Sequence, residues 1–150
     1  LAHEKGIFDR ALKYLLNLRL GAPVRRYNWT MTIDPLLDTA PETYPIWGPT
    51  RATLEKGNVG ERMNLRVEVQ ALFRLPRSNA IAFSIRCYLV RFEDLVTVPK
   101  WGRRLHRVIK ELHPDLAAYK GFLRNRPLMV EYLAQFDDGA PTSPGCWPDE

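Results

Sequence analysis

Three segments of the chain alternate apolar and polar residues, which is the pattern of β-strands that turn one face toward a core. The first covers residues 24–33, the second residues 65–76 and the third residues 81–89. Only a short turn separates the last two, which leaves no room for a crossover helix and predicts an antiparallel pair. The predicted apolar face of this pair consists of Leu65, Val67, Val69, Ala71, Ile81, Phe83, Ile85, Cys87 and Leu89.

Apolar residues at helical spacing predict helices on both sides of these strands. One helix is expected within residues 7–18, and three more within residues 101–112, 114–120 and 127–136. Residues 34–49 contain four prolines and predict a loop, which its aromatic side chains should hold against the body of the protein. The order of helix, strands and helices predicts an α+β fold, with helices packed on the apolar face of the sheet.

The composition is that of an ordinary globular protein with a core of its own. The chain has 150 residues, of which 45% are hydrophobic and 26% charged, so a single domain is expected. The net charge is +5, which permits nucleic-acid binding, but the arginines are scattered along the chain rather than gathered in a basic run. We therefore favour a mixed surface and no nucleic-acid partner, and keep a basic interaction module as an alternative.

The two cysteines, Cys87 and Cys146, do not form the framework of a disulfide-rich protein, which indicates a reducing compartment such as the cytoplasm. No apolar run has the length of a membrane span, so no membrane partner is expected. Residues 137–150 are rich in proline, glycine and acidic residues and predict a flexible tail. Residues 1–136 are then expected to form the domain, which begins in what reads as a helix already under way and is predicted to be incomplete.

Polar side chains recur on the strand face opposite the predicted apolar one. They are Arg26, Asn28, Arg66, Glu68, Gln70, Ser84, Arg86 and Tyr88. Guanidinium groups suit carboxylates or phosphates, and a carboxylate among them can hold an ammonium group or act as a base. The same pattern is also typical of a solvated outer sheet face whose ion pairs contribute little energy. Periodicity leaves both interpretations open.

The remaining candidate chemistry in the sequence is sparse. None of the three histidines has a second ligand at metal spacing, so no metal site is expected. His106 lies one residue off the apolar stripe of its helix and is predicted on the helix surface. The chain has no glycine-rich phosphate loop, serine elbow or pair of carboxylates at catalytic spacing.

Four segments together resemble the haem-dependent oxidative N-demethylase family, whose members were long known as a domain of unknown function. The segments are residues 23–29, 65–76, 80–88 and 119–121, in the same order as in the family. The Arg-x-Asn-Trp pattern ending at Trp29 and the Arg-x-Glu-x-Gln pattern followed by Arg-Leu-Pro are fairly specific together. Two positions depart from the family pattern: Cys87 stands where threonine is expected, and Val69 where arginine is expected.

The resemblance implies a PAS-like antiparallel sheet whose helices form a haem pocket. It implies an α subunit that oxidises a small secondary amine such as dimethylamine with O2. It further implies electrons from NADPH, FMN and a 2Fe–2S centre on an electron-transfer partner subunit, and tetrahydrofolate as acceptor of formaldehyde. Family members carry a His-x-Pro-Val-Pro-like segment upstream of the first strand, so the resemblance implies an axial haem ligand outside this chain.

The resemblance also suggests roles for the polar strand residues. Glu68 is the expected catalytic residue and would hold the protonated amine. The expected haem-binding residues are Arg66, Arg86 and Arg26, and the expected substrate-binding residues are Gln70, Tyr88 and Asn28. A PAS-like sensor that binds haem or a small molecule without turnover is the principal alternative.

Overall fold

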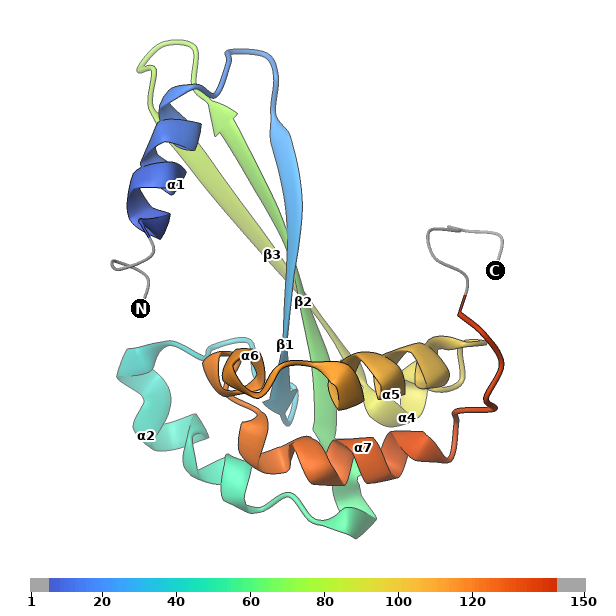
Figure 1. The fold of residues 1–150 in the computed structure, drawn as a ribbon. Helices are drawn as coiled ribbons and strands as arrows, with labels where there is room; N and C mark the ends of the chain where they lie inside the picture. Colours follow the sequence, from blue (N-terminus) through green and yellow to red (C-terminus); the bar gives the residue numbers. More distant parts are fainter. Residues whose placement is uncertain (1–5, 143–150) are drawn as a thin grey trace. The chain divides into compact units, whose positions relative to one another are not determined.

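The computed structural model describes residues 6–142, and its centre is a three-stranded antiparallel sheet (Figure 1). The strands are β1 (Val24–Ile33), β2 (Met63–Arg74) and β3 (Ile81–Arg91), in the order β1-β2-β3. The three predicted strands and the α+β class are confirmed, although β2 begins two residues earlier than expected and β3 ends two later. The resemblance to a PAS domain remains a prediction.

The four predicted helices are also present. They are α1 (Ile7–Leu16), α5 (Trp101–Glu111), α6 (Pro114–Tyr119) and α7 (Arg126–Ala134). The prediction of a plain loop over residues 34–49 was wrong, because this segment contains η1 (Pro41–Thr43), α2 (Tyr44–Trp47) and the start of η2 (Pro49–Ala52). Each of these turns has a proline at its first or second position, where the missing N–H costs no helical hydrogen bond.

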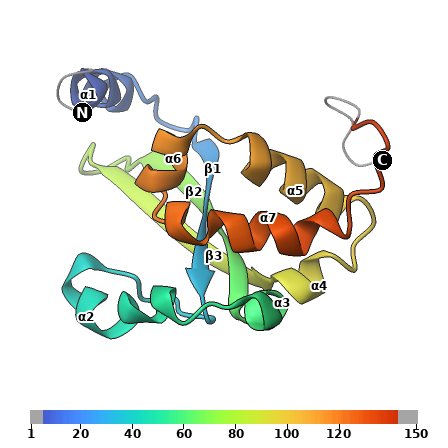
Figure 2. The ribbon, with the colours of Figure 1, turned by 60° about the horizontal axis from the view of Figure 1, so that its bottom comes forward.

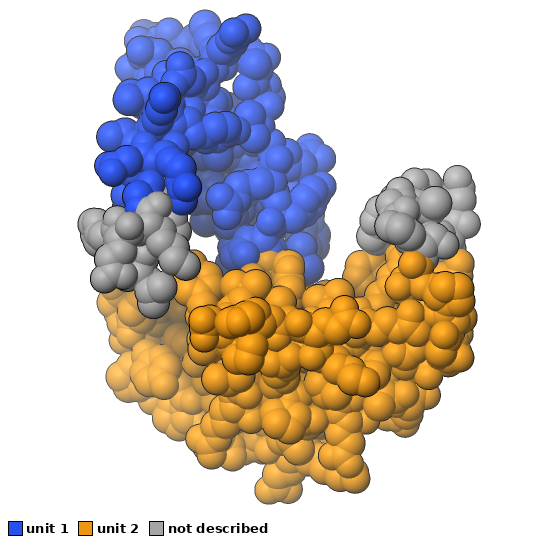
Figure 3. All heavy atoms as spheres, in the orientation of Figure 1, with its two compact units in different colours: residues 1–28, 67–88 blue, residues 29–66, 89–150 orange. Residues whose placement is uncertain are grey.

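Four further helical turns were not predicted, because three or four residues are too few to show a period. They are η3 (Lys56–Asn58), α3 (Val59–Arg62), α4 (Phe92–Leu95) and η4 (Leu123–Asn125). The chain divides into two compact units, coloured in Figure 3. Unit 1 comprises residues 1–28 and 67–88, and unit 2 comprises residues 29–66 and 89–150. Every strand of the sheet contributes one part to each unit.

Unit 2 contains most of the buried apolar residues. Helices α5 and α7 lie side by side in it, as Figures 1 and 2 both show. Its fully buried side chains include Val59, Met63, Phe92, Ile109, Met129 and Leu133. The start of α5 also lies close to the segment that follows α7, because an added Cβ at Gly102 would lie 2.6 Å from Cβ of Phe136. A glycine at this position therefore allows the contact between the start of α5 and the residues just after α7.

The prediction that His106 lies on a helix surface was wrong. Its side chain on α5 is 8% exposed, and its Nδ1 lies 2.8 Å from Oδ2 of Asp137. The apolar stripe alone missed this burial, because the residue that covers His106 follows α7 in the sequence. Asp137 belongs to the segment that composition assigned to a flexible tail, and residues 143–150 of that segment lie outside the described residues.

Unit 1 is held together differently, by polar contacts to the end of α1. Arg74 on β2 donates from Nε to Leu18 O at 2.7 Å and from Nη2 to Leu15 O and Leu16 O. Its Nη1 also donates to Asn79 O in the turn between β2 and β3. A single guanidinium thus binds the last two carbonyls of α1, which lack partners within the helix, and the carbonyl of Leu18 just beyond it.

The predicted apolar face of the β2–β3 hairpin is not a core in unit 1. Phe83 is 53% exposed and Ile85 is 49% exposed, whereas Leu18 and Leu72 are the buried apolar residues of the described part of this unit. The expectation that Phe83 and Ile85 face the core was therefore wrong. The turn between β2 and β3 explains why the side chains of these two strands are divided between the sheet faces differently from the sequence prediction.

Asn79 forms a bulge at that turn. Leu75 N–H donates to Ala80 O at 2.8 Å, while Leu75 O accepts from the N–H of Asn79, whose φ is 59°. Asn79 and Ala80 therefore both stand opposite Leu75, as in a bulge whose first residue is left-handed. One extra residue on β3 shifts its alternation, so even-numbered positions of β2 share a face with odd-numbered positions of β3 beyond the turn.

Candidate functional site

A carboxylate held by two amides lies in unit 1. Oε2 of Glu68 accepts a hydrogen bond from Nε2 of Gln70 at 2.8 Å and one from Nδ2 of Asn28 at 3.2 Å. Glu68 and Gln70 are two residues apart on β2 and so share a face, and the contact with Asn28 places this β1 residue on the same face. Three of the predicted site residues are thereby brought together.

Gln70 has an acceptor that nothing in residues 6–142 satisfies. The residue is 6% exposed, and its Oε1 is buried without a hydrogen-bond partner in the described part of the chain. Leaving a buried acceptor unpaired costs about 1–3 kcal/mol. A ligand with N–H or O–H donors would gain binding free energy by donating a hydrogen bond to this atom, which belongs to a side chain in contact with the Glu68 carboxylate.

The predicted site residues on β3 lie on the other sheet face. The bulge at Asn79 places the odd-numbered residues of β3 on the face of Glu68. Arg86 and Tyr88 are even-numbered, so their side chains lie on the opposite face. Both are exposed, and the Arg86 guanidinium lies 5.2 Å from the centre of the Tyr88 ring. The prediction of one continuous polar face was wrong for this hairpin, and the Glu68 face is completed on β3 by Phe83, Ile85 and Cys87.

The two other predicted haem-binding arginines have different surroundings. Arg66 belongs to unit 2, is 7% exposed, and donates from Nη1 to Leu37 O at 2.9 Å and to Leu36 O at 3.3 Å. These bonds fix the chain that leaves β1. Arg26 is exposed on β1, two residues before Asn28, and alternation places it on the Glu68 face.

A small cleft in unit 2 was not predicted. Its volume is about 140 Å³, and it is lined by Thr30, Met31, Thr32, Ile33, Leu36, Thr39, Trp47, Thr50 and Arg51. The sequence offered only a weak signal, namely aromatic residues in a proline-rich segment expected to pack on the body. Nothing local indicated that Arg51 would lie over Trp47, with its Cζ 4.7 Å from the ring centre.

A third polar cluster joins the end of α7 to α5. The carboxylate of Asp137 accepts from Arg107 at 2.6 and 3.0 Å and contacts His106, while Arg103 donates to Asp138 at 2.6 Å. The hydrogen bonds from Arg107, followed by the contact with His106, hold the pKa of Asp137 well below its usual range. The network connects elements of unit 2 and has the character of a structural clamp.

Residues 6–142 contain neither a metal-binding cluster nor a helix able to cross a membrane. No group of three or more histidine, cysteine, aspartate or glutamate side chains there is arranged to hold a metal ion. No helix in this part of the chain is long and apolar enough to cross a membrane. Cys87 is half-buried, and Cys146 lies outside the described residues.

The fold and the Glu68 cluster define an α+β protein with a polar cluster on one face of an antiparallel sheet. The family described as haem-dependent oxidative N-demethylase, alpha subunit-like, has a model that matches residues 4–130. This match spans most of the chain, which therefore belongs to that family, as its strand motifs indicated.

Proposed function

We propose that this chain takes part in haem-dependent oxidative removal of a methyl group from a small secondary amine such as dimethylamine. The observation that carries the proposal is the Glu68 carboxylate, oriented by two amides beside the unpaired Oε1 of Gln70. Membership of the family supplies the reaction class. Bound haem would activate O2 with two electrons derived from NADPH, so that the methyl group leaves as formaldehyde and the second oxygen atom as water.

The residues of unit 1 fit one side of a haem site. Phe83 and Ile85 are large apolar side chains left half exposed on the Glu68 face, which suits contact with a porphyrin plane. Arg26 on the same face can pair with a propionate. The cleft in unit 2, at about 140 Å³, is too small for haem, because sites for drug-sized ligands measure about 300–1,000 Å³.

Glu68 and Gln70 would bind and orient the amine. A protonated secondary amine has two N–H donors. One would donate to the Glu68 carboxylate and the other to Oε1 of Gln70. A charge-assisted hydrogen bond to Glu68 would be the stronger of the two. Asn28 would act as a positioning residue, since it contacts the carboxylate from β1.

The protein would depend on partners for electrons. The family name describes an alpha subunit, which supports the existence of other subunits. We place FMN and a 2Fe–2S centre on such a partner, and tetrahydrofolate as the acceptor of formaldehyde, on the family resemblance alone. The axial ligand of the haem is expected outside this chain.

The test uses the full-length protein reconstituted with haem. Addition of dimethylamine should shift the Soret band, and O2 consumption with an electron donor should depend on the amine. Glu68→Gln should weaken amine binding about tenfold or more while haem content stays constant, because it removes the charge that pairs with the ammonium group. Glu42→Gln, a matched change at an exposed residue of η1, should leave both properties unchanged.

The outcomes separate the candidate functions. A full-length protein that takes up no haem would refute the proposal. Amine binding without O2 consumption would instead support the PAS-like sensor. If Glu68→Gln binds the amine as tightly as the wild type, Glu68 does not hold the ammonium group, whatever the reaction.

A further inference from the structure

The cleft of unit 2 lies along the free edge of the sheet. Asp34 N–H donates to Arg62 O, so even-numbered residues of β1 direct their backbone groups toward β2. The odd-numbered residues direct theirs to the opposite edge, where Trp29 O accepts from Nζ of Lys120. The backbone N–H groups of Met31 and Ile33 therefore point outward from this edge of the sheet. Both residues also line the cleft.

Two polar side chains of the cleft have no hydrogen-bond or ion-pair partner in residues 6–142. Oγ1 of Thr32 is buried, and it neither accepts nor donates a hydrogen bond within that part of the chain. The guanidinium of Arg51 pairs there with no carboxylate, and no acidic residue lines the cleft. An uncompensated cation, an orphan hydroxyl and edge N–H groups all favour a ligand with negatively charged oxygen atoms.

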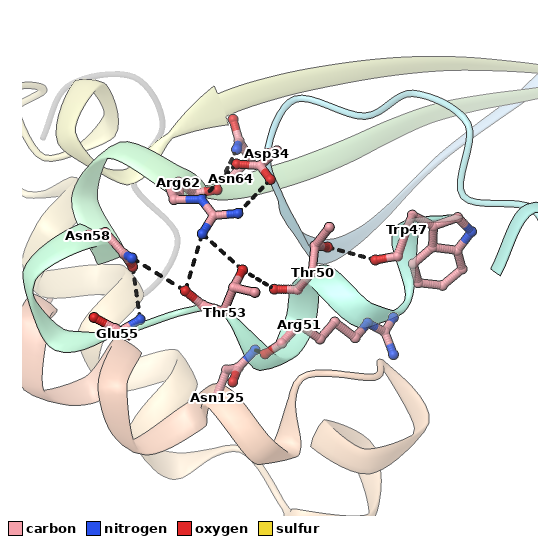
Figure 4. Close-up of polar contacts among 10 residues, drawn as sticks. All are labelled: Asp34, Trp47, Thr50, Arg51, Thr53, Glu55, Asn58, Arg62, Asn64 and Asn125. Atoms are coloured by element: carbon pink, nitrogen blue, oxygen red, sulfur yellow. Dashed lines mark hydrogen bonds and ion pairs between the residues drawn. The ribbon is translucent and has the colours of Figure 1, made fainter. Parts of the chain in front are cut away.

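The position of Arg51 is built by the surrounding structure (Figure 4). Its carbonyl accepts from Nδ2 of Asn125 at 3.1 Å, and Asn125 is itself 6% exposed. Its guanidinium stacks on Trp47 and lies against Gly121, where an added Cβ would be 2.9 Å from Nη2. Arg51 is thus held on both sides rather than left free in solvent.

The segment that carries Arg51 is anchored a few residues further on. The guanidinium of Arg62 binds both carboxylate oxygens of Asp34, at 2.9 and 2.8 Å, and its Nη1 donates to Thr53 O and Oγ1 (Figure 4). This fork ties the end of β1 to the turn that follows η2. A ligand would therefore meet a largely preformed site and lose little affinity to ordering the protein.

Size and lining narrow the class of ligand. At about 30 Å³ for each water-sized group, a volume of about 140 Å³ accommodates roughly five heavy atoms. The apolar residues Met31, Ile33, Leu36 and Trp47 are among those that line the same space, which suits a short hydrocarbon group better than a phosphate. We propose that this cleft binds a short-chain carboxylate, with its oxygens at Arg51 and Thr32 and its alkyl group against Trp47.

Propionate is a suitable probe, and propionamide is its neutral counterpart of the same shape. In an NMR titration of the full-length protein, propionate should shift the signals of Thr32 N–H, Met31 N–H and Arg51 Nε–H. Propionamide and inorganic phosphate should bind at least about tenfold more weakly, because the first lacks the charge and the second lacks the apolar group. The proposal concerns unit 2 and does not rest on haem chemistry.

Variants distinguish a binding site from a structural arginine. Arg51→Gln should weaken propionate binding about tenfold, and Arg51→Lys by less, since it keeps the charge but loses the fork. Thr32→Val should weaken binding several-fold without lowering the Tm, because it removes a hydroxyl that has no partner in the folded chain. Arg77→Gln, at an exposed arginine of the hairpin turn, should bind propionate like the wild type.

Three results would overturn the proposal. They are an absence of shifts at tens of millimolar propionate, equal binding of propionate and propionamide, and unchanged affinity in a folded Arg51→Gln variant. Should Arg51→Gln fail to fold, Thr32→Val still decides, because unaltered propionate affinity in that variant would show that the orphan hydroxyl does not face the ligand.

Discussion

At the residue scale, the structure leaves two buried acceptor groups without partners in residues 6–142, and they belong to two different units. One is Oε1 of Gln70, whose amide group contacts the carboxylate of Glu68, and the other is Oγ1 of Thr32, a residue that lines the same cleft as Arg51. Each costs folding free energy as it stands. Each is also near a charged group that can bind a ligand, Glu68 in one case and Arg51 in the other. We therefore propose a ligand at each of these two positions.

Asp137 is the charged residue whose contribution to stability should depend most clearly on pH. Its pKa in the folded chain is lowered, so its stabilising effect is fully present above the pKa of an unfolded aspartate, about 3.9. The effect is lost as the pH falls through the lower folded pKa. We expect Asp137→Asn to lower the free energy of unfolding at neutral pH, because the amide oxygen is a weaker acceptor for Arg107.

Urea unfolding over a range of pH values tests this expectation. The stability difference between wild type and Asp137→Asn should shrink as the pH falls below about 4. Asp115→Asn is a suitable control, because the side chain of Asp115 is 94% exposed. A difference that stays constant down to acid pH would mean that the Asp137 clamp does not stabilise the fold through its charge.

At the scale of elements, the close approach of α5 to the residues just after α7 depends on a residue without a side chain. A Cβ at position 102 would lie 2.6 Å from Phe136 Cβ and 3.4 Å from Val96 Cγ1. Alanine gains at most about 1 kcal/mol over glycine in helix propensity, and overpacking costs about 1–3 kcal/mol. We therefore expect Gly102→Ala to reduce the free energy of unfolding, as measured by chemical denaturation.

The control for this substitution is Gly57→Ala in η3, where an added Cβ meets nothing within 4 Å. That variant should unfold with the same midpoint as the wild type or a slightly higher one. If Gly102→Ala were as stable as Gly57→Ala, the start of α5 and the residues just after α7 would have to separate easily. The contact would then be looser than the structure indicates.

The helices and strands could largely be predicted from the sequence, because the spacing of apolar residues and the positions of proline and glycine specify them locally. The arrangement of their faces could not. The extra residue at Asn79 moves Arg86 and Tyr88 to the face opposite Glu68, and strand periodicity alone does not reveal which turn residue is left-handed. Likewise the Arg51 cleft and the burial of His106 depend on residues distant in the sequence, Asn125 and Asp137.

At the scale of the whole chain, the two units differ in how much apolar surface they bury. Most of the buried apolar side chains belong to unit 2, whereas Phe83 and Ile85 of unit 1 remain about half exposed. Burial of apolar area is the main favourable contribution to folding. The same exposed residues that weaken unit 1 are the ones proposed to contact haem, so ligand binding and stability should be coupled in that unit.

Hydrogen exchange in the full-length protein, before and after haem is added, tests this coupling. Amides of residues 67–88 should exchange with a lower opening free energy than those of α5 and α7, because less apolar surface protects them. Addition of haem should slow exchange in residues 67–88 and leave α5 and α7 nearly unchanged, since a ligand stabilises the states to which it binds. Equal protection of both units before addition would contradict the stability argument, and haem-induced protection confined to α5 and α7 would place the haem contacts in unit 2 instead.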